Sequence, residues 1–257
     1  MGGSAKYREA KKAEEQSSQQ KSNRRRLVGR NQRTNTNSKV NPYNISRRRM
    51  NQILARNYND EGVLITDALT KDEKLAFVDA YSSAMRTEPQ ITAMARSVAN
   101  DLGMPLLGEK TRRKSVKSAT EKVNNNKLAN NPDTLNDLVR YTHEVGELNF
   151  GNDVNSAIGK YEKAGYKVAW INNTWRDQSR AYKGVNVTFK TPNGGLFEVQ
   201  FHTQKSFNLK TNQLHQLYEE QRKFEWHSSK WWSYENRMLD LSKQIPVPNG
   251  VSNIRIY

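Results

Sequence analysis

The chain has 257 residues, with 42 Lys or Arg against 26 Asp or Glu, a formal net charge of +16, and only 35% hydrophobic residues. The absence of cysteine excludes a disulfide framework and a cysteine-based zinc site. The apolar stretches are far shorter than the ~20 residues that span a bilayer, and the first residues contain no apolar signal core. We therefore expect no membrane segment and a cytoplasmic site of action, with export by a signal-free route left open.

The positive charge is concentrated in residues 1–55. This segment has 14 Lys or Arg and 3 Asp or Glu, a net of +11, whereas residues 56–100 have 5 and 7, a net of −2. Because it also lacks apolar periodicity, we predict a basic, disordered tail. It is either an arm that neutralises phosphates of RNA or DNA, or a solvated linker or tether.

Residues 56–106 are predicted to form a helical extension of two or three helices. Thr70 and Glu73 form a capping box. The residues behind it recur at helical spacing, namely Phe77, Tyr81, Ala84 and Met85. A second helix is expected after Pro89 and should end near Gly103.

Residues 107–257 have the pattern of an α+β domain. Helices are expected at 115–126, 154–161 and 214–224, and strands at 138–145, 166–172, 185–189 and 196–203, of which 166–172 is apolar enough to be buried. The last two strands flank Pro192-Asn193-Gly194-Gly195, which is typical of a β-hairpin turn. An aromatic cluster follows, Trp226, Trp231, Trp232 and Tyr234, for which we expect core or lid packing rather than base stacking.

Alternation in the hairpin predicts which side chains share a face. Phe197, Val199 and Phe201 should point to one side of the sheet. Glu198, Gln200 and His202 should point to the other side, next to Asn186 and Thr188 of the neighbouring strand. Such a polar row is either exposed to solvent or part of a functional site, and alternation alone favours the exposed face.

Four motifs, in order, cover about 115 residues. R-x-K-S-x-x-S-x-x-x-K runs from Arg112 to Lys122, and Asp137 follows at the entrance of a strand. Y-K-G-V-N begins at Tyr182, and E-V-Q-F-H-T begins at Glu198. Their types and order resemble the synthetase domain of the RelA/SpoT-homologue family of nucleotide pyrophosphokinases. The E-V-Q-F-H-T variant is similar to the toxic small synthetases found in phage-borne and polymorphic-toxin systems.

This resemblance implies a nucleotidyltransferase-like mixed β-sheet flanked by helices, and a role for each motif residue. Asp137 and Glu198 would hold Mg²⁺ and act as the catalytic residues, with Glu198 taking the hydroxyl proton. The residues implied to bind ATP are Arg112, Lys114, Ser118, Lys122 and Arg140. The residues implied to bind the acceptor are Tyr182, whose ring would stack on the base, Asn186, Gln200 and His202.

Three positions depart from the family pattern. Thr142 stands where the family commonly has an arginine, and Arg140 lies two positions earlier. Asn186 replaces the usual histidine, and His202 replaces the usual arginine. The site is therefore expected to be less cationic than that of an alarmone synthetase.

The resemblance implies Mg²⁺-dependent transfer of pyrophosphate from ATP to the 3′-hydroxyl of a purine nucleotide, giving a ppGpp- or ppApp-like product. The chain would act as a growth-inhibiting toxin, with an antitoxin or immunity protein as an expected partner and delivery with a phage particle as an expected route. One alternative is pyrophosphorylation of the tRNA 3′ end, which the basic tail would help to hold. Another is a non-catalytic, basic nucleic-acid-binding or phage structural protein.

Overall fold

The computed structural model describes residues 70–126 and 135–256. The predicted basic tail, 1–55, and the first part of the helical extension lie outside the described residues. The helices are α3 (Lys71–Leu102), α4 (Val116–Asn126), α5 (Phe150–Lys163), α6 (Gln204–Leu209), α7 (His215–Gln221) and α8 (Ser229–Lys243). The strands are β1 (Arg140–Glu144), β2 (Lys167–Asn173), β3 (Val185–Lys190) and β4 (Leu196–His202).

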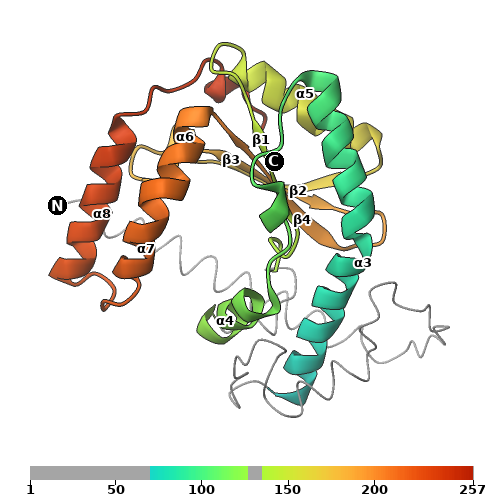
Figure 1. Cartoon of the computed structure of the whole chain (residues 1–257), viewed down its shortest axis with the longest axis horizontal. Coiled ribbons are helices and arrows are strands. Elements are labelled where there is room, and N and C mark those ends of the chain that lie inside the picture. Colours follow the sequence, from blue (N-terminus) through green and yellow to red (C-terminus); the bar gives the residue numbers. More distant parts are fainter. Residues whose placement is uncertain (1–69, 127–134, 257) are drawn as a thin grey trace. The chain divides into compact units, whose positions relative to one another are not determined.

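The strands form one mixed sheet in the order β1-β4-β3-β2. The predicted hairpin is confirmed, since β3 and β4 pair antiparallel, with Phe189 opposite Phe197 and Val185 opposite Phe201. β1 pairs parallel to β4, with Arg140 opposite Glu198. α3 and α5 lie on one side of the sheet and α6, α7 and α8 on the other (Figure 1). The predicted α+β class, a mixed sheet flanked by helices, is confirmed.

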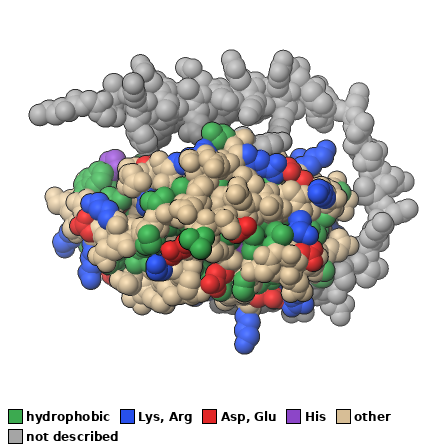
Figure 2. Space-filling view, turned by 90° about the horizontal axis from the view of Figure 1, so that it is seen from above, with side chains coloured by type: hydrophobic (Ala, Val, Ile, Leu, Met, Phe, Trp, Pro, Cys, Tyr) green, Lys and Arg blue, Asp and Glu red, His purple; other side chains and the backbone are tan. Residues whose placement is uncertain are grey.

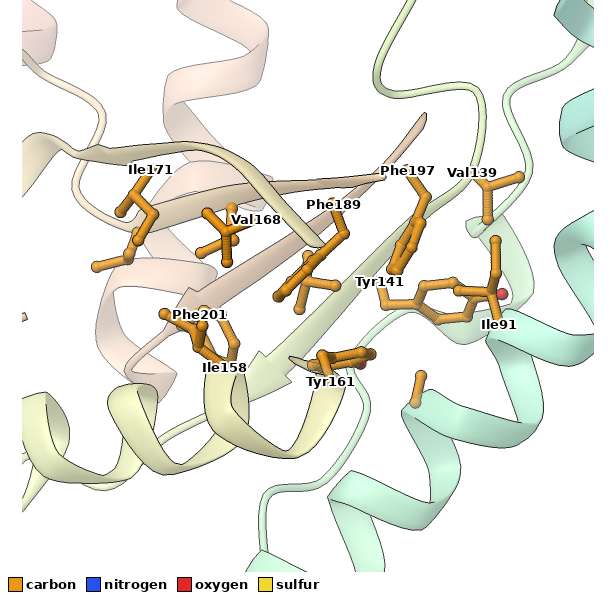
Figure 3. Packing of buried hydrophobic residues seen from close by; sticks show 14 of the residues in the cluster. Ile91, Val139, Tyr141, Ile158, Tyr161, Val168, Ile171, Phe189, Phe197 and Phe201 are labelled. Atoms are coloured by element: carbon orange, nitrogen blue, oxygen red, sulfur yellow. The ribbon is translucent and has the colours of Figure 1, made fainter. Parts of the chain in front are cut away.

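The core lies between the sheet and the two helices α3 and α5. The apolar row of β4, Phe197, Val199 and Phe201, is fully buried there, as the alternation predicts. Figure 3 shows Ile158 and Tyr161 of α5 beneath these strands. Burial of large apolar side chains against a sheet is the main favourable term in folding, at roughly 25 cal/mol per Å² of apolar area. The polar row of β4 therefore has to lie on the opposite face.

The predicted break at Pro89 is wrong, because α3 continues through this residue. The helix begins one residue after Thr70, the predicted N-cap. Pro89 removes the N–H that would bond to the carbonyl of Met85. The buried stripe nevertheless runs on from Met85 to Ile91, so packing against one continuous core outweighs the loss of a single helical hydrogen bond.

The prediction that the strand at 166–172 is buried is also wrong in part. β2 is an edge strand, paired only with β3. Val168 is buried, but Trp170 is 54% exposed, and the pairing is irregular between these two residues. An apolar composition alone does not distinguish a central strand from an edge strand.

α6, α7 and α8 have their own small apolar cluster, made of Ala181, Leu209, Leu214 and Met238. The tip between α7 and α8 carries the predicted aromatic cluster. Trp226 is 59% and Trp232 is 45% exposed, so the expected core packing is wrong for these two side chains. The ring of His227 stacks on that of Trp232 at 5.3 Å.

No helix within the described ranges is both long and apolar enough to cross a membrane. On the face of the molecule in Figure 2, Lys and Arg side chains are interspersed with Asp and Glu rather than gathered in one patch. The strongest concentration of positive charge in the sequence, in residues 1–55, lies outside the described residues.

Candidate active site

The polar row of β4 lies at the centre of the sheet, because β4 is flanked by β1 and β3. Glu198 faces Arg140 on one side and Thr188 on the other. Gln200 faces Thr142 and Asn186 in the same way. Glu198, Gln200 and His202 are 8%, 4% and 0% exposed, so the expectation of a solvent-exposed polar face is wrong. A buried row of acid, amide and imidazole requires partners, and the neighbouring elements supply them.

Glu198 is the carboxylate at the centre of this row. Its Oε1 accepts a hydrogen bond of 2.7 Å from Nε2 of Gln200. Burial raises the pKa of the Glu198 carboxyl, Arg140 opposes this shift, and the negative charge of Asp137 adds to it. A carboxylate whose pKa is moved upward accepts a proton more readily near neutral pH, which suits a general base.

Asp137 lies between two lysines that the sequence places in one motif. Nζ of Lys114 is 2.9 Å from Oδ2, and Nζ of Lys122 is 2.8 Å from Oδ1. Burial alone would raise the pKa of the Asp137 carboxyl, but the two ammonium groups outweigh it and hold the pKa below its usual value. The adjacent Asn136 donates to Thr188, the β3 neighbour of Glu198, and so ties this segment to the sheet.

Different elements bring the two lysines to Asp137. Arg113 forms a β-bridge with Val139, just before β1. The backbone N–H of the next residue, Lys114, donates to the carbonyl of Leu138. Lys122 projects from α4. The seven residues between the lysines thus turn from an extended segment into a helix, so that both ammonium groups reach the same carboxylate.

The structure does not bring Arg112 or Ser118 to this cluster. Nε of Arg112 is 2.5 Å from Oε1 of Glu88, a side chain of α3 that is only 1% exposed. Arg113 pairs with the other oxygen of Glu88 at 3.0 Å. Ser118 bonds within its own helix turn, where Ser115 Oγ donates to its hydroxyl. Sequence spacing placed these residues beside Lys114 but could not show which way their side chains turn.

Tyr182, Asn186 and His202 form a second group beside the first. The Tyr182 hydroxyl donates to Oδ1 of Asn186 at 2.6 Å and lies 2.8 Å from Nε2 of His202. Nδ1 of His202 lies 2.9 Å from the hydroxyl of Ser206. Burial lowers the pKa of His202 well below its usual value, with the positive charge of Lys210 acting in the same direction. His202 is therefore neutral at pH 7 and does not supply the positive charge of an arginine.

Lys210 is the residue that sequence reasoning missed. It begins the π-helical turn Lys210–Leu214, directly after α6. Its Nζ donates to Oε1 of Gln200 at 2.6 Å and lies 5.8 Å from the centre of the Tyr182 ring. A signal was available, because Ser206 and Lys210 are four residues apart in a helix that follows the polar strand and thus share one face.

The arrangement therefore contains two carboxylates within electrostatic reach of each other and four cations: Lys114, Lys122, Arg140 and Lys210. Oxygen ligands of this kind fit Mg²⁺, which takes one or two carboxylates and fills its other positions with water or phosphate. Among the described residues no group of three or more His, Cys, Asp or Glu side chains could hold a metal ion. Any metal here would thus depend on Asp137, Glu198 and the oxygens of a substrate.

The fold and the site together define an α+β protein with an acid and base cluster on one face of a mixed sheet. No protein-family model and no curated protein sequence matches the chain. Among solved structures, the type VI effector Tas1 in complex with its immunity protein is 22% identical, with a TM-score of 0.49, over 69% of this chain and 97% of that chain.

Two further structures are those of a bacterial alarmone synthetase and a bacterial pyrophosphokinase family protein. The small alarmone synthetase 1 from Bacillus subtilis bound to its product pppGpp is 16% identical, with a TM-score of 0.45, over 65% of this chain and 88% of that chain. A GTP pyrophosphokinase family protein from Streptococcus pneumoniae is 17% identical, with a TM-score of 0.44, over 68% of this chain and 90% of that chain. At these identities the similarity concerns the fold alone.

Proposed function

We propose that the chain is a pyrophosphokinase-type transferase that moves pyrophosphate from ATP to the 3′-hydroxyl of a purine nucleotide and thereby inhibits growth. The observation that carries the proposal is a buried carboxylate at Glu198 within electrostatic reach of a second carboxylate, Asp137, which pairs with two lysines. Transfer of a charged phosphoryl group depends mainly on alignment and on neutralisation of charge, and this cluster offers both.

In the proposed reaction the acceptor's 3′-oxygen attacks the β-phosphorus of ATP. A new oxygen–phosphorus bond forms, the bond from the β-phosphorus to the bridging oxygen of the α-phosphate breaks, and AMP leaves. Glu198 takes the hydroxyl proton, for which its raised pKa suits it. Mg²⁺ bound by Asp137 and Glu198 would neutralise negative charge on the phosphates.

Lys114 and Lys122 are the proposed contacts to the ATP phosphates. Their side chains are 20% and 25% exposed, so they can turn from Asp137 toward a ligand. Mg²⁺ held at Asp137 would neutralise this carboxylate, and Lys114 and Lys122 would then bind phosphate oxygens in place of Asp137. Arg140, opposite Glu198, is a further proposed donor contact, and the ring of Tyr182 is the proposed platform for the acceptor base.

The test is transfer of label from ATP labelled at the γ-phosphate. The purified chain with Mg²⁺ is offered AMP, ADP, ATP, GDP, GTP and bulk tRNA in separate reactions, with Glu198→Gln as the matched variant. We expect label on a purine nucleotide with AMP released in equal amount, and a loss of at least about 100-fold in the variant. ADP as the by-product would indicate a kinase instead. If the wild type and Glu198→Gln transfer label equally, the result favours the alternative that the chain is non-catalytic.

The tRNA arm tests the main alternative. The net charge of +11 in residues 1–55 favours an RNA acceptor, because basic segments bind phosphate backbones through counterion release. Label on tRNA that falls steeply with added salt would assign the acceptor to RNA. Growth arrest on expression of the wild type but not of Glu198→Gln would support the toxin role, and a co-expressed protein that restores growth would identify the proposed immunity partner.

A further inference from the structure

Lys210 is a cation held on the polar face without an acidic contact. Among the residues described, its Nζ has one hydrogen-bond acceptor, Oε1 of Gln200, and forms no ion pair. The rings of Tyr182 and Phe207 lie 5.8 and 5.6 Å from it. An ammonium group has three donors, so two of them remain to be satisfied.

The electrostatic surroundings make this placement unfavourable in the protein alone. Burial lowers the pKa of Lys210 to about 8, and the positive charge of Arg140 acts in the same direction. Glu198 attracts the ammonium group but does not contact it. The Arg140 guanidinium likewise makes no side-chain hydrogen bond or ion pair within the described part of the chain. Glu198 attracts both cations, but neither makes a direct ion pair with it among the described residues. An anion that binds both of them would supply that direct contact.

Gln200 fixes Lys210 relative to the proposed base. Its amide oxygen accepts from Lys210 and its amide nitrogen donates to Glu198, so the ammonium group is one side chain away from the carboxylate. Tyr182 and Asn186 are only half-buried, so this edge of the row is reached from solvent. An anion at Lys210 would therefore lie between the ring of Tyr182 and the reacting centre.

We propose that Lys210, with Arg140, forms a phosphate-binding subsite that anchors a nucleotide phosphate next to Tyr182 and Glu198. This inference rests on the proposed function for the identity of the nucleotide, whereas binding of the anion itself does not require catalysis. The phosphate belongs either to the acceptor nucleotide or to the donor, and the two sources are separable by experiment.

The test compares Lys210→Met, which keeps the length and removes the charge, with Lys210→Arg, which keeps the charge. Lys205→Met is the matched control, because Lys205 lies on α6, five residues before Lys210, but its side chain is 61% exposed and pairs with Glu147. Titration calorimetry on the full chain measures Kd for ADP, for GDP, for a methylene-bridged ATP analogue and for inorganic pyrophosphate.

We expect Lys210→Met to raise Kd at least tenfold for one of these probes, Lys210→Arg to recover most of the affinity, and Lys205→Met to stay within twofold. Weaker binding of ADP or GDP alone assigns the phosphate to the acceptor. Weaker binding of the ATP analogue or of pyrophosphate assigns it to the donor. Unchanged Kd for every probe in Lys210→Met overturns the proposal.

Thermal unfolding separates this role from a structural one. A cation kept for a ligand costs stability in the free protein, so Lys210→Met should melt at the same temperature as the wild type or higher. A clear fall in Tm, with all losses of binding tracking it, would assign Lys210 to structure and contradict the proposal. If label transfer fails in the wild type while pyrophosphate still binds through Lys210, the proposed function fails and the subsite stands.

Discussion

The rings of Tyr182 and His202 meet edge to face, with centroids 5.3 Å apart and planes at 90°. Gly184 lies in the angle between them: a Cβ on this residue would be 2.7 Å from Cε1 of His202 and 3.0 Å from the Tyr182 hydroxyl. The glycine of the Y-K-G-V-N motif is thus required by close packing, not by a positive φ. It sets the position of the ring that we propose to stack on the acceptor.

Gly184→Ala should therefore displace Tyr182 or His202. His202 is fully buried and has no room to move, so we expect a loss of about 1–3 kcal/mol in the free energy of unfolding and a raised KM for the acceptor. Gly146→Ala is the control, since nothing lies within 4 Å of its added Cβ. Urea unfolding and initial-rate kinetics measure the two effects. An alanine that leaves both quantities unchanged would contradict the required close packing.

Asp137→Asn should separate charge from shape at the proposed metal site. The amide keeps the size of the carboxylate but removes the charge that holds Lys114 and Lys122 and that would bind Mg²⁺. We expect label transfer to fall at least about 100-fold. The free energy of unfolding should fall by only about 1–2 kcal/mol, because both lysines are partly exposed.

The measurement is transfer rate against Mg²⁺ concentration, together with urea unfolding. Asp240→Asn is the matched control, since Asp240 pairs with Lys243 on α8, where both side chains are 70% exposed. A normal rate in Asp137→Asn at saturating Mg²⁺ would remove Asp137 from the proposed metal site.

His143 should make the protein sensitive to acid. It is fully buried, its Nε2 lies 3.0 Å from the Tyr161 hydroxyl, and burial lowers its pKa to about 4. The unfolded chain, with a histidine pKa of about 6.5, binds the proton first, so stability is lost as pH falls from about 6.5 toward 4. For this group alone the loss between pH 7 and pH 4.5 is roughly 2 kcal/mol.

Urea unfolding at pH 7 and pH 4.5 measures this loss. His143→Gln removes the titrating group and should reduce the difference between the two pH values, while His202 and the carboxylates keep part of it. The exposed His215 provides the matched substitution, and His215→Gln is measured at the same two pH values. An equal pH dependence in His143→Gln and the wild type would argue against the lowered pKa.

Gly151 and Gly159 on α5 should respond to alanine in opposite directions. A Cβ at Gly151 would be 1.9 Å from the carbonyl oxygen of Gly250, whereas nothing lies within 4 Å of a Cβ at Gly159. Gly151→Ala must push the backbone around Gly250 away and should cost about 3 kcal/mol. Gly159→Ala should stabilise by about 0.5–1 kcal/mol, since alanine is the better helix former. Thermal unfolding distinguishes the two, and equal shifts would show that α5 does not pack on this turn.

Local periodicity accounts for what the sequence predicted well. The alternation in β3 and β4 predicted the hairpin and the two rows of side chains, because strand geometry sends successive residues to opposite faces whatever surrounds them. The grouping of Lys114, Lys122 and Asp137 came instead from the resemblance of the motifs to the synthetase family, and the structure brings these three side chains together. Alternation did not show that the polar row is buried, since it says nothing about what covers a face.

The sequence by itself determined the α+β class, the hairpin and the core row of β4, because these depend on short-range spacing. The charged residues near Glu198 were marked by the resemblance of the motifs, not by spacing. The tertiary structure alone decided that β1 lies parallel beside β4, that Arg112 turns to Glu88, that α3 runs through Pro89 and that Lys210 reaches Gln200. Each of these four features depends on packing between segments that are distant in the chain. The free energy gained by burying side chains between those segments outweighs the local conformational preferences on which sequence patterns rest.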